Sequence, residues 1–180
     1  MITAHINNMI GRIPFRIFLP VVLTVLLFIM TIFLLILPAT EERMMEGKRE
    51  VIRELVASVW SSLDGYARKE QKGVITRDQA QALAIEHIRG LRYGRDFKDY
   101  FWINDMQPMM IMHPYVKKLE GQDLSAYEDP NGTRLFVNMV NIVKKDGEGF
   151  VDYVWQKGDD KILAPKISYV KGFAPWGWLV

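Results

Sequence analysis

The chain has 180 residues, enough for one ordinary domain and a membrane anchor, with a net charge of +2 and no cysteine. Its basic residues are interspersed with acidic ones instead of forming a stripe, which argues against a nucleic-acid-binding surface. The lack of cysteine excludes disulfide bonds and thiolate metal sites.

The first predicted element is a membrane-spanning helix at residues 17–37. This segment has no charged residue, and its only hydroxyls, on Thr24 and Thr31, can bond to carbonyls of the helix itself. About 21 residues at about 1.5 Å each span roughly 31 Å, the hydrocarbon thickness of a bilayer. A buried globular helix is seldom apolar on every face, and a cleaved signal peptide has a shorter apolar region. We therefore expect an uncleaved anchor.

The orientation of this helix is read from the charges around it. Arg12 and Arg16 precede it, while Arg43, Lys48 and Arg49 follow it, so the positive-inside rule gives a nearly even count. A leader of residues 1–16 is easily left inside. We therefore expect the leader in the cytoplasm and a domain from residue 41 onward on the far side of the membrane.

Two further helices are predicted after the anchor. Apolar residues recur at helical spacing between residues 41 and 72, which indicates a long amphipathic stalk that continues the membrane helix past Pro38, a residue able to kink it. Its apolar face would pack on the domain or on a dimer partner. Thr76 and Gln79 form a capping-box pattern, which predicts a helix to about residue 89. Its inner face would carry Ala80, Leu83, Ala84 and Ile88.

The rest of the chain is typical of an antiparallel sheet with one inserted helix, an α+β arrangement. Aromatic and β-branched runs bounded by turn residues predict strands at residues 98–103, 109–113, 150–156, 162–173 and 176–180. A helix is predicted at residues 131–145. Because the sequence stops within its last apolar strand, we expect it to be a fragment of a longer protein, truncated at the C-terminus.

No catalytic, metal or cofactor site is expected from the residues. The three histidines, His5, His87 and His113, lack metal-ligand spacing, and no glycine-rich loop has phosphate-binding form. The segment 129–132, Asp-Pro-Asn-Gly, lacks the alternating ligands of a calcium loop and is read as a turn before a helix.

A ligand pocket is a better-supported possibility than catalysis. Rings with polar tips lie on the predicted strands, at Tyr100, Trp102, Tyr153, Trp155 and Tyr169. His113 and Lys166 are candidate hydrogen-bond donors to an anionic ligand. The same rings could form an ordinary core, His113 could be a structural strand-end residue, and Lys166 could face water, since alternation alone does not select its face.

Eight groups of residues, in order along the chain, resemble one known family. They are Leu91–Gly94, Asp99–Asp105, Met112–Pro114, Gly121–Leu124 with Asp129–Gly132, Gly147–Val151, Tyr153–Trp155, Pro165–Val170 and Phe173–Trp178. Together they are similar to the single Cache domain of the second type, over about residues 45–180. Two departures are the irregular connection at residues 156–160 and the missing closing strand after Trp178.

This resemblance implies an extracytoplasmic sensor module of a bacterial receptor, with a PAS-like antiparallel sheet behind a long N-terminal helix. Such modules bind small molecules, many of them carboxylates, without a cofactor. In the family the positions of Tyr100, Trp102, His113, Tyr153 and Lys166 tend to line the pocket. The resemblance further implies that the chain as given crosses the bacterial inner membrane once, with the domain in the periplasm and a homodimer through the stalk helix. The family's second membrane helix and output domain are expected outside this sequence.

The resulting hypothesis is that a carboxylate pairs with Lys166 and His113 and shifts the stalk helix, which signals to a cytoplasmic output domain outside this sequence. That domain could be a histidine kinase, a chemoreceptor module or a cyclase. Two alternatives stay open at this point. One is a structural, dimerising membrane anchor, and the other is an enzyme anchored outside the membrane.

Overall fold

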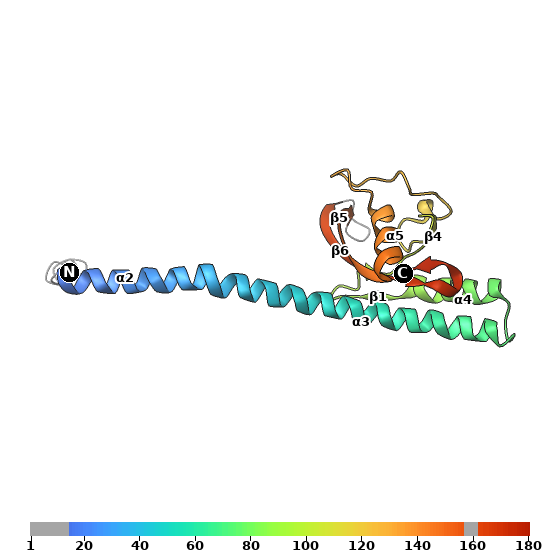
Figure 1. Cartoon of the computed structure of the whole chain (residues 1–180), viewed down its shortest axis with the longest axis horizontal. Coiled ribbons are helices and arrows are strands. Elements are labelled where there is room, and N and C mark those ends of the chain that lie inside the picture. Colours follow the sequence, from blue (N-terminus) through green and yellow to red (C-terminus); the bar gives the residue numbers. More distant parts are fainter. Residues whose placement is uncertain (1–14, 157–161) are drawn as a thin grey trace. The chain divides into compact units, whose positions relative to one another are not determined.

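The computed structural model describes residues 15–156 and 162–180 of the chain (Figure 1). The predicted leader, apart from its last two residues, and most of the irregular connection at 156–160 lie outside the described residues. The chain divides into two compact units between Lys48 and Arg49, and each is described here by itself. The elements in chain order are α2 (Phe15–Thr31), η1 (Ile32–Ile36), α3 (Leu37–Gln71), α4 (Arg77–Gly90), β1 (Arg92–Tyr93), β2 (Asp99–Tyr100), β3 (Ile103–Asp105), β4 (Met110–Met112), η2 (Lys117–Leu119), α5 (Leu135–Asp146), β5 (Glu148–Gln156), β6 (Leu163–Phe173), η3 (Ala174–Trp176) and β7 (Trp178–Leu179).

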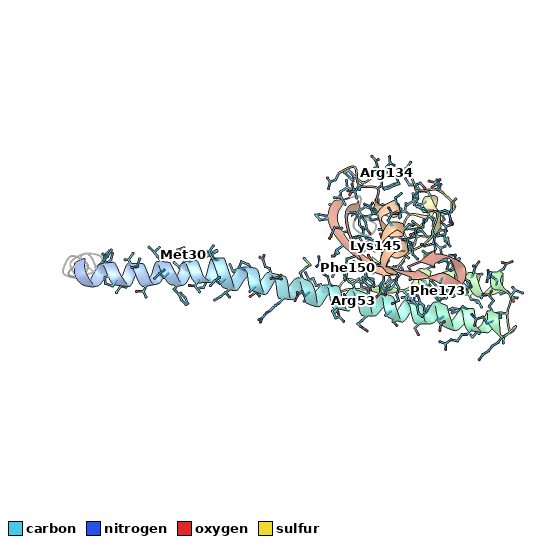
Figure 2. All side chains as sticks on the ribbon, viewed as in Figure 1. Met30, Arg53, Arg134, Lys145, Phe150 and Phe173 are labelled. Atoms are coloured by element: carbon cyan, nitrogen blue, oxygen red, sulfur yellow. The ribbon has the colours of Figure 1, made fainter. Side chains whose placement is uncertain are left out.

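The described part of the first unit, residues 15–48, is helical, and most of it is apolar. From Phe18 onward the helix is long and apolar enough to cross a membrane, and its large side chains are exposed, as Met30 shows in Figure 2. As expected, the Thr24 and Thr31 hydroxyls donate to the carbonyls of Pro20 and Leu27 four residues earlier. A π-helical turn, η1, lies directly before Pro38. The exact span of residues 17–37 stays a prediction.

In the second unit, α3 and α4 carry the expected features with one exception. The capping box is formed: the Thr76 hydroxyl accepts from the Gln79 N–H at 3.2 Å, and the Gln79 side chain accepts from the Thr76 N–H at 2.9 Å. Ala80, Ala84 and Ile88 are buried on α4. Leu83, which was expected among them, is 45% exposed because it lies one residue off the packed face.

The predicted antiparallel sheet is confirmed, with the strand order β4-β3-β7-β6-β5 and α5 inserted between β4 and β5. The last strand of the sequence is therefore central, between β3 and β6. It is shorter than the predicted 176–180, because η3, which contains Pro175, occupies the preceding residues. β5 and β6 form the longest ladder and β5 is an edge of the sheet.

The single strand predicted at 98–103 is wrong. The chain forms two short strands there, β2 paired with β1 and β3 paired in the main sheet. The break falls at Phe101 and Trp102, whose rings are buried in different clusters: Phe101 in the core against α3 and α4, Trp102 in the core against α5. Consecutive residues of an extended chain project to opposite sides, so the two rings enter different cores at the point where the chain passes from pairing with β1 to the main sheet.

Two glycines bring α5 close to the sheet. A Cβ atom at Gly172 would lie 2.6 Å from Val143 Cγ1, and one at Gly149 would lie 2.6 Å from Ile142 Cγ2. The opposite face packs on α3, where the Arg53 guanidinium lies 5.7 Å from the ring centroids of Phe150 and Tyr169 (Figure 2). The sheet is thus covered on both faces.

Candidate functional site

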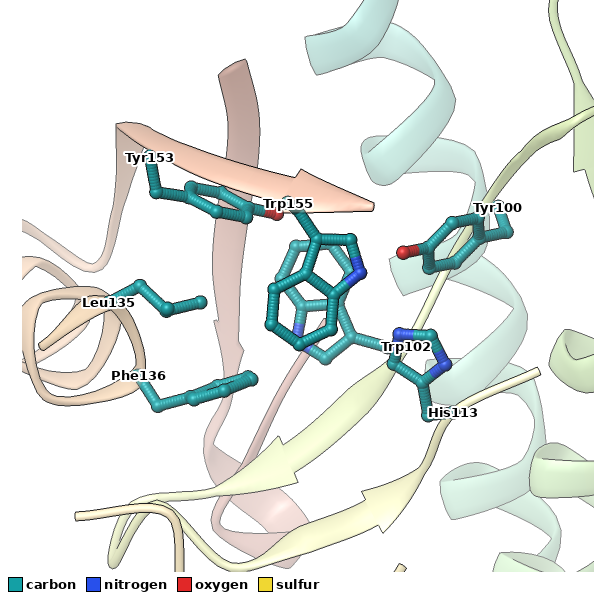
Figure 3. A pocket seen from close by; sticks show the side chains of 7 residues that line it. All are labelled: Tyr100, Trp102, His113, Leu135, Phe136, Tyr153 and Trp155. Atoms are coloured by element: carbon teal, nitrogen blue, oxygen red, sulfur yellow. The ribbon is translucent and has the colours of Figure 1, made fainter. Parts of the chain in front are cut away.

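A hollow lies in the core on the α5 side of the sheet (Figure 3). Its free volume is about 10 Å³, roughly the room that one water molecule needs. A ligand larger than water would therefore require the lining side chains to move apart. The lining side chains come from β2, the link between β2 and β3, the residue after β4, α5 and β5, and are Tyr100, Trp102, His113, Leu135, Phe136, Tyr153 and Trp155.

Four of the five predicted site residues are among these lining residues, and the fifth, Lys166, lies beside them. Lys166 on β6 pairs directly with Tyr153 on β5, so both side chains project from the same face of the sheet. Its Nζ atom lies 4.0 Å from the ring centroid of Tyr100 and 5.7 Å from that of Trp102. The strand register thus brings the cation to the aromatic wall.

Tyr169 does not belong to this wall. It pairs with Phe150 in the ladder and packs on that ring, with centroids 4.8 Å apart, in the core on the α3 side. It lies three positions after Lys166, an odd number, so the two side chains project from opposite faces of the strand. The sequence hypothesis of five rings around one pocket is wrong for this ring.

Burial destabilises the charge on Lys166. It lowers the pKa of the ammonium to about 8, against a smaller opposing effect of the Asp99 carboxylate. Among the described residues, no carboxylate lies within salt-bridge distance of Nζ. The ammonium is held by ring faces instead, which stabilise a cation less than an anionic partner would.

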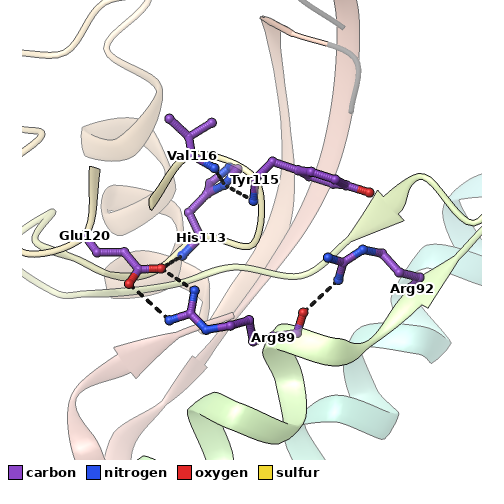
Figure 4. A network of polar contacts seen from close by, with 6 residues as sticks. All are labelled: Arg89, Arg92, His113, Tyr115, Val116 and Glu120. Carbon is purple, nitrogen blue, oxygen red and sulfur yellow. Dashed lines mark hydrogen bonds and ion pairs between the residues drawn. The ribbon is translucent and has the colours of Figure 1, made fainter. Parts of the chain in front are cut away.

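His113 is fixed in one tautomer by the backbone around it (Figure 4). Its Nδ1 atom accepts hydrogen bonds from the Tyr115 N–H at 3.2 Å and the Val116 N–H at 3.0 Å. An atom that accepts two hydrogen bonds carries no proton, so the neutral ring has its proton on Nε2. Burial, helped by the nearby Lys166 charge, lowers the pKa of His113 to about 3. The ring is a neutral donor.

Glu120 connects His113 to α4 (Figure 4). One carboxylate oxygen accepts from the His113 N–H at 3.0 Å, and Arg89 donates to both oxygens at 2.5 and 3.1 Å. Burial alone would raise the pKa of Glu120, but these hydrogen bonds outweigh it and hold the pKa below its usual value. His113 is therefore supported by residues that lie far from it in sequence.

Trp155 supplies a third donor to the hollow. Its Nε1–H is directed toward the Tyr100 side of the hollow (Figure 3). Within the part of the chain that the structure describes, this buried N–H makes no hydrogen bond of full geometry. It makes only a weak contact with the Tyr100 hydroxyl, which lowers the Tyr100 pKa against the larger effect of burial. A buried donor without a partner destabilises a fold by about 1–3 kcal/mol, so such groups usually have a functional explanation.

The other polar tips of the wall are occupied. The Trp102 Nε1–H donates to Asn104 Oδ1 at 3.1 Å, and the Tyr153 hydroxyl bonds to the Ser168 hydroxyl at 2.9 Å. Burial raises the pKa of both Tyr100 and Tyr153, so these hydroxyls stay protonated. The arrangement thus offers one cation and neutral N–H donors within an apolar hollow, which suits a small anion.

Sequence reasoning named the Trp155 ring but not its N–H as part of the site, although alternation with Tyr153 on one strand places both side chains on the same face. It did not name Leu135 and Phe136, which fall in the predicted helix at residues 131–145 and line the hollow at the start of α5.

Comparison with known proteins gives consistent matches. The family model for "Single Cache domain 2" matches residues 44–180. The chain is 42% identical over 135 residues to the methyl-accepting chemotaxis protein McpP of Pseudomonas putida. That alignment covers 75% of this chain but 24% of McpP, so the chain spans about a quarter of that relative's length.

Two solved structures share the fold. One is a periplasmic sensor domain of a chemotaxis protein, with 42% identity and a TM-score of 0.73, covering 76% of this chain and 94% of that one. The other, a Cache chemosensory domain solved to explain carboxylic acid recognition, has 44% identity and a TM-score of 0.73, covering 77% and 92%. This chain belongs to the family of single Cache sensor domains of the second type.

Proposed function

We propose that this chain is the ligand-sensing part of a bacterial transmembrane receptor and that it binds a short-chain carboxylate in the hollow. The observation that carries the proposal is the Lys166 ammonium, which lies 4.0 Å from the Tyr100 ring centroid and has no salt bridge within the described residues. A carboxylate beside Nζ would supply the missing counter-charge in a partly dry site, where charge-assisted bonds are strong.

The neutral donors favour a carboxylate over other small anions. His113 offers Nε2–H and Trp155 offers Nε1–H on the same side of the hollow as Lys166, which suits the two oxygens of a carboxylate. The apolar tail would then lie toward Leu135 and Phe136. The small free volume favours a tail of a few carbon atoms, because a longer tail would require the wall to open further. Carboxylic acid recognition by the 44% identical Cache domain supports this ligand class.

Signalling is the second part of the proposal. The hollow is connected to α4 through His113, Glu120 and Arg89, and the sheet packs on α3 through Phe150 and Arg53. Binding would bias the position of these helices, provided that the ligand prefers one of two arrangements. The helical run from Phe18 to Gln71 would carry the bias through the inner membrane to a cytoplasmic output domain, with the sensor domain in the periplasm.

Dimerisation through α3 completes the proposal. Met44 and Val51 are 58% and 59% exposed and seven residues apart, so they fall on the same face of the helix. Their pairing with a second copy would bury this apolar stripe.

The ligand proposal is tested with the 180-residue chain in detergent micelles. Thermal shift and titration calorimetry with acetate, propionate, lactate and pyruvate should identify at least one ligand. Lys166→Met keeps the aliphatic stem on Tyr100 but removes the charge, and should weaken binding at least tenfold. Lys144→Met, at an exposed position on α5, is the matched control and should leave binding unchanged. No binding by any of the four acids, or equal binding by Lys166→Met, would overturn the proposal.

A further inference from the structure

A loop of residues 123–134, called here the covering loop, connects the turn after β4 to α5 and packs on the wall of the hollow. Tyr127 is its central contact. The Tyr127 ring lies 5.6 Å, centroid to centroid, from both Phe136 and Trp155, two residues that line the hollow. The loop then leads directly into Leu135, a third lining residue. The position of the covering loop therefore affects two parts of the wall, one on β5 and one on α5.

The covering loop is held by one buried carboxylate. Asp129 is 5% exposed, and its Oδ1 atom accepts from the Asn131 N–H at 2.9 Å and the Thr133 N–H at 2.8 Å, which shapes the loop. Its Oδ2 atom accepts from the Val154 N–H at 2.8 Å, which ties the loop to β5. Burial alone would raise the pKa of Asp129, but these N–H groups outweigh it and hold the pKa low. One side chain thus joins two segments.

On the strand side, the Asp129 contact is made by Val154, which lies on an edge of the sheet. β5 is an edge strand, and Val154 pairs with Pro165 on β6. Proline has no N–H, so this is a pair without ladder hydrogen bonds, and the Val154 N–H is directed away from β6. An outward N–H on an edge strand is free to bind a side chain. Val154 also lies between Tyr153 and Trp155, both of which line the hollow.

We propose that Asp129 is a positioning residue that latches the covering loop onto β5 and thereby controls how fast a ligand enters and leaves the hollow. The inference rests on the proposed binding function but adds a kinetic role to a residue that does not touch the ligand. Opening of the Oδ2–Val154 bond would release Tyr127 from Trp155 while the turn formed by Oδ1 persists.

The test is Asp129→Asn, which keeps an oxygen for the turn but replaces the oxygen that binds Val154 with an NH₂ group. The matched control is Asp123→Asn. Asp123 makes a similar local turn, with Oδ1 accepting from the Ser125 N–H at 2.8 Å, but its carboxylate binds no strand. Both variants are compared with the wild-type chain in detergent micelles.

Stopped-flow fluorescence with propionate, or whichever of the four acids binds the wild type, should show that Asp129→Asn raises both the association and the dissociation rate, with dissociation at least tenfold faster. Asp123→Asn should change neither rate by more than about twofold. A variant that is merely less well folded would bind more slowly instead, and that result, or unchanged rates, would overturn the latch. Tyr127→Ala, with Asp129 intact, should also accelerate dissociation if Asp129→Asn folds poorly, and an unchanged rate would again overturn it.

Hydrogen–deuterium exchange separates this inference from the proposed function. Without any ligand, the peptide that contains Val154 should exchange faster in Asp129→Asn than in the wild type or in Asp123→Asn. If the wild type binds none of the four acids but the exchange differs as expected, the ligand proposal fails and the Asp129–Val154 contact stands. If the exchange is the same in all three proteins, the latch is wrong whatever the chain binds.

Discussion

At the scale of single residues, the hollow contains groups that weaken the fold in isolation. The Lys166 ammonium is held among rings with its pKa lowered to about 8, and the buried Trp155 Nε1–H has no partner among the described residues. Neither is needed for packing, since methionine and phenylalanine would fill the same space. Residues that reduce stability without a packing role are typical of binding sites, where the ligand supplies the missing interaction.

The pH dependence of binding should report Lys166 and not His113. Lys166 is charged below its pKa of about 8 and neutral above it, whereas His113, with its pKa near 3, stays neutral throughout this range. Calorimetric affinity for the carboxylate should therefore stay level between about pH 5 and pH 7 and fall about tenfold per unit above the Lys166 pKa.

Lys166→Arg is the control for this profile. Arginine keeps its charge at every accessible pH, so any carboxylate binding that the variant retains should lose the alkaline fall. A change of affinity centred near the ordinary histidine pKa, in the wild type, would contradict the assignment of His113 as a fixed neutral donor.

Trp155→Phe isolates the indole donor from the ring. The phenyl ring keeps most of the contact with Tyr127 and Phe136 but removes the Nε1–H. Because that N–H has no partner among the described residues, urea unfolding should show a stability within about 1 kcal/mol of the wild type. Carboxylate affinity, in contrast, should fall roughly tenfold, the effect of one hydrogen bond to a charged group. Unchanged affinity together with a clear loss of stability would mean that Trp155 is only a core residue.

Part of this site was predictable from local sequence and part was not. Tyr100, Tyr153 and Lys166 lie on strands, and Trp102 lies between two strands, in segments whose aromatic and β-branched composition is visible in the sequence. Strand pairing alone brings Lys166 opposite Tyr153. Alternation along the predicted strand at 162–173 could have separated Tyr169 from Lys166, but composition does not tell which of the two faces the hollow.

The supports of the site depend on contacts between distant residues. Glu120 binds Arg89 31 residues away, and Asp129 binds Val154 25 residues away. No periodicity within a segment reports such pairs.

At the scale of elements, the start of a helix was predictable where a side chain caps it. The predicted start was wrong where a side chain binds the backbone N–H groups of the residues expected to begin the helix. Thr76 and Gln79 fixed the start of α4. The helix predicted from residue 131 begins instead at Leu135, because Asp129 binds the N–H groups of Asn131 and Thr133 and holds them in a turn. The same competition that shortens the helix creates the latch.

The close approach of α5 to the sheet gives the prediction at this scale. Gly172→Ala places a methyl group 2.6 Å from Val143 Cγ1, so α5 must shift, and the free energy of unfolding should fall by about 1–3 kcal/mol. Gly65→Ala in α3 is the control, since a Cβ there meets nothing within 4 Å, and it should raise stability by about 0.5–1 kcal/mol. Equal effects of the two changes in urea unfolding would show that α5 does not depend on this contact.

At the scale of the whole molecule, the chain joins an apolar helix to a sensor domain of a receptor family. The apolar run was evident from composition, because a globular helix is seldom apolar on every face over six turns. The family followed from motifs spread over the domain, and the family model that matches residues 44–180 confirms it. What composition cannot report is whether two copies pair, because exposed apolar residues on a helix fit several partners.

Disulfide trapping tests the proposed pairing through α3, and the natural sequence suits it because it has no cysteine. Met44→Cys and Val51→Cys lie on one face of the helix, whereas Glu46→Cys lies on nearly the opposite face at about 100° per residue. In membranes treated with a mild oxidant, the first two variants should form covalent dimers on non-reducing gels and the third should not. Pairing along this face brings Cβ atoms within disulfide range only at inward positions. Equal cross-linking at all three positions would indicate random collision, and none at Met44 or Val51 would place the dimer contact elsewhere.

A ligand-dependent change in the ratio of the Met44→Cys and Val51→Cys cross-links would further show that the sensor domain moves this helix, which is the step that signalling requires.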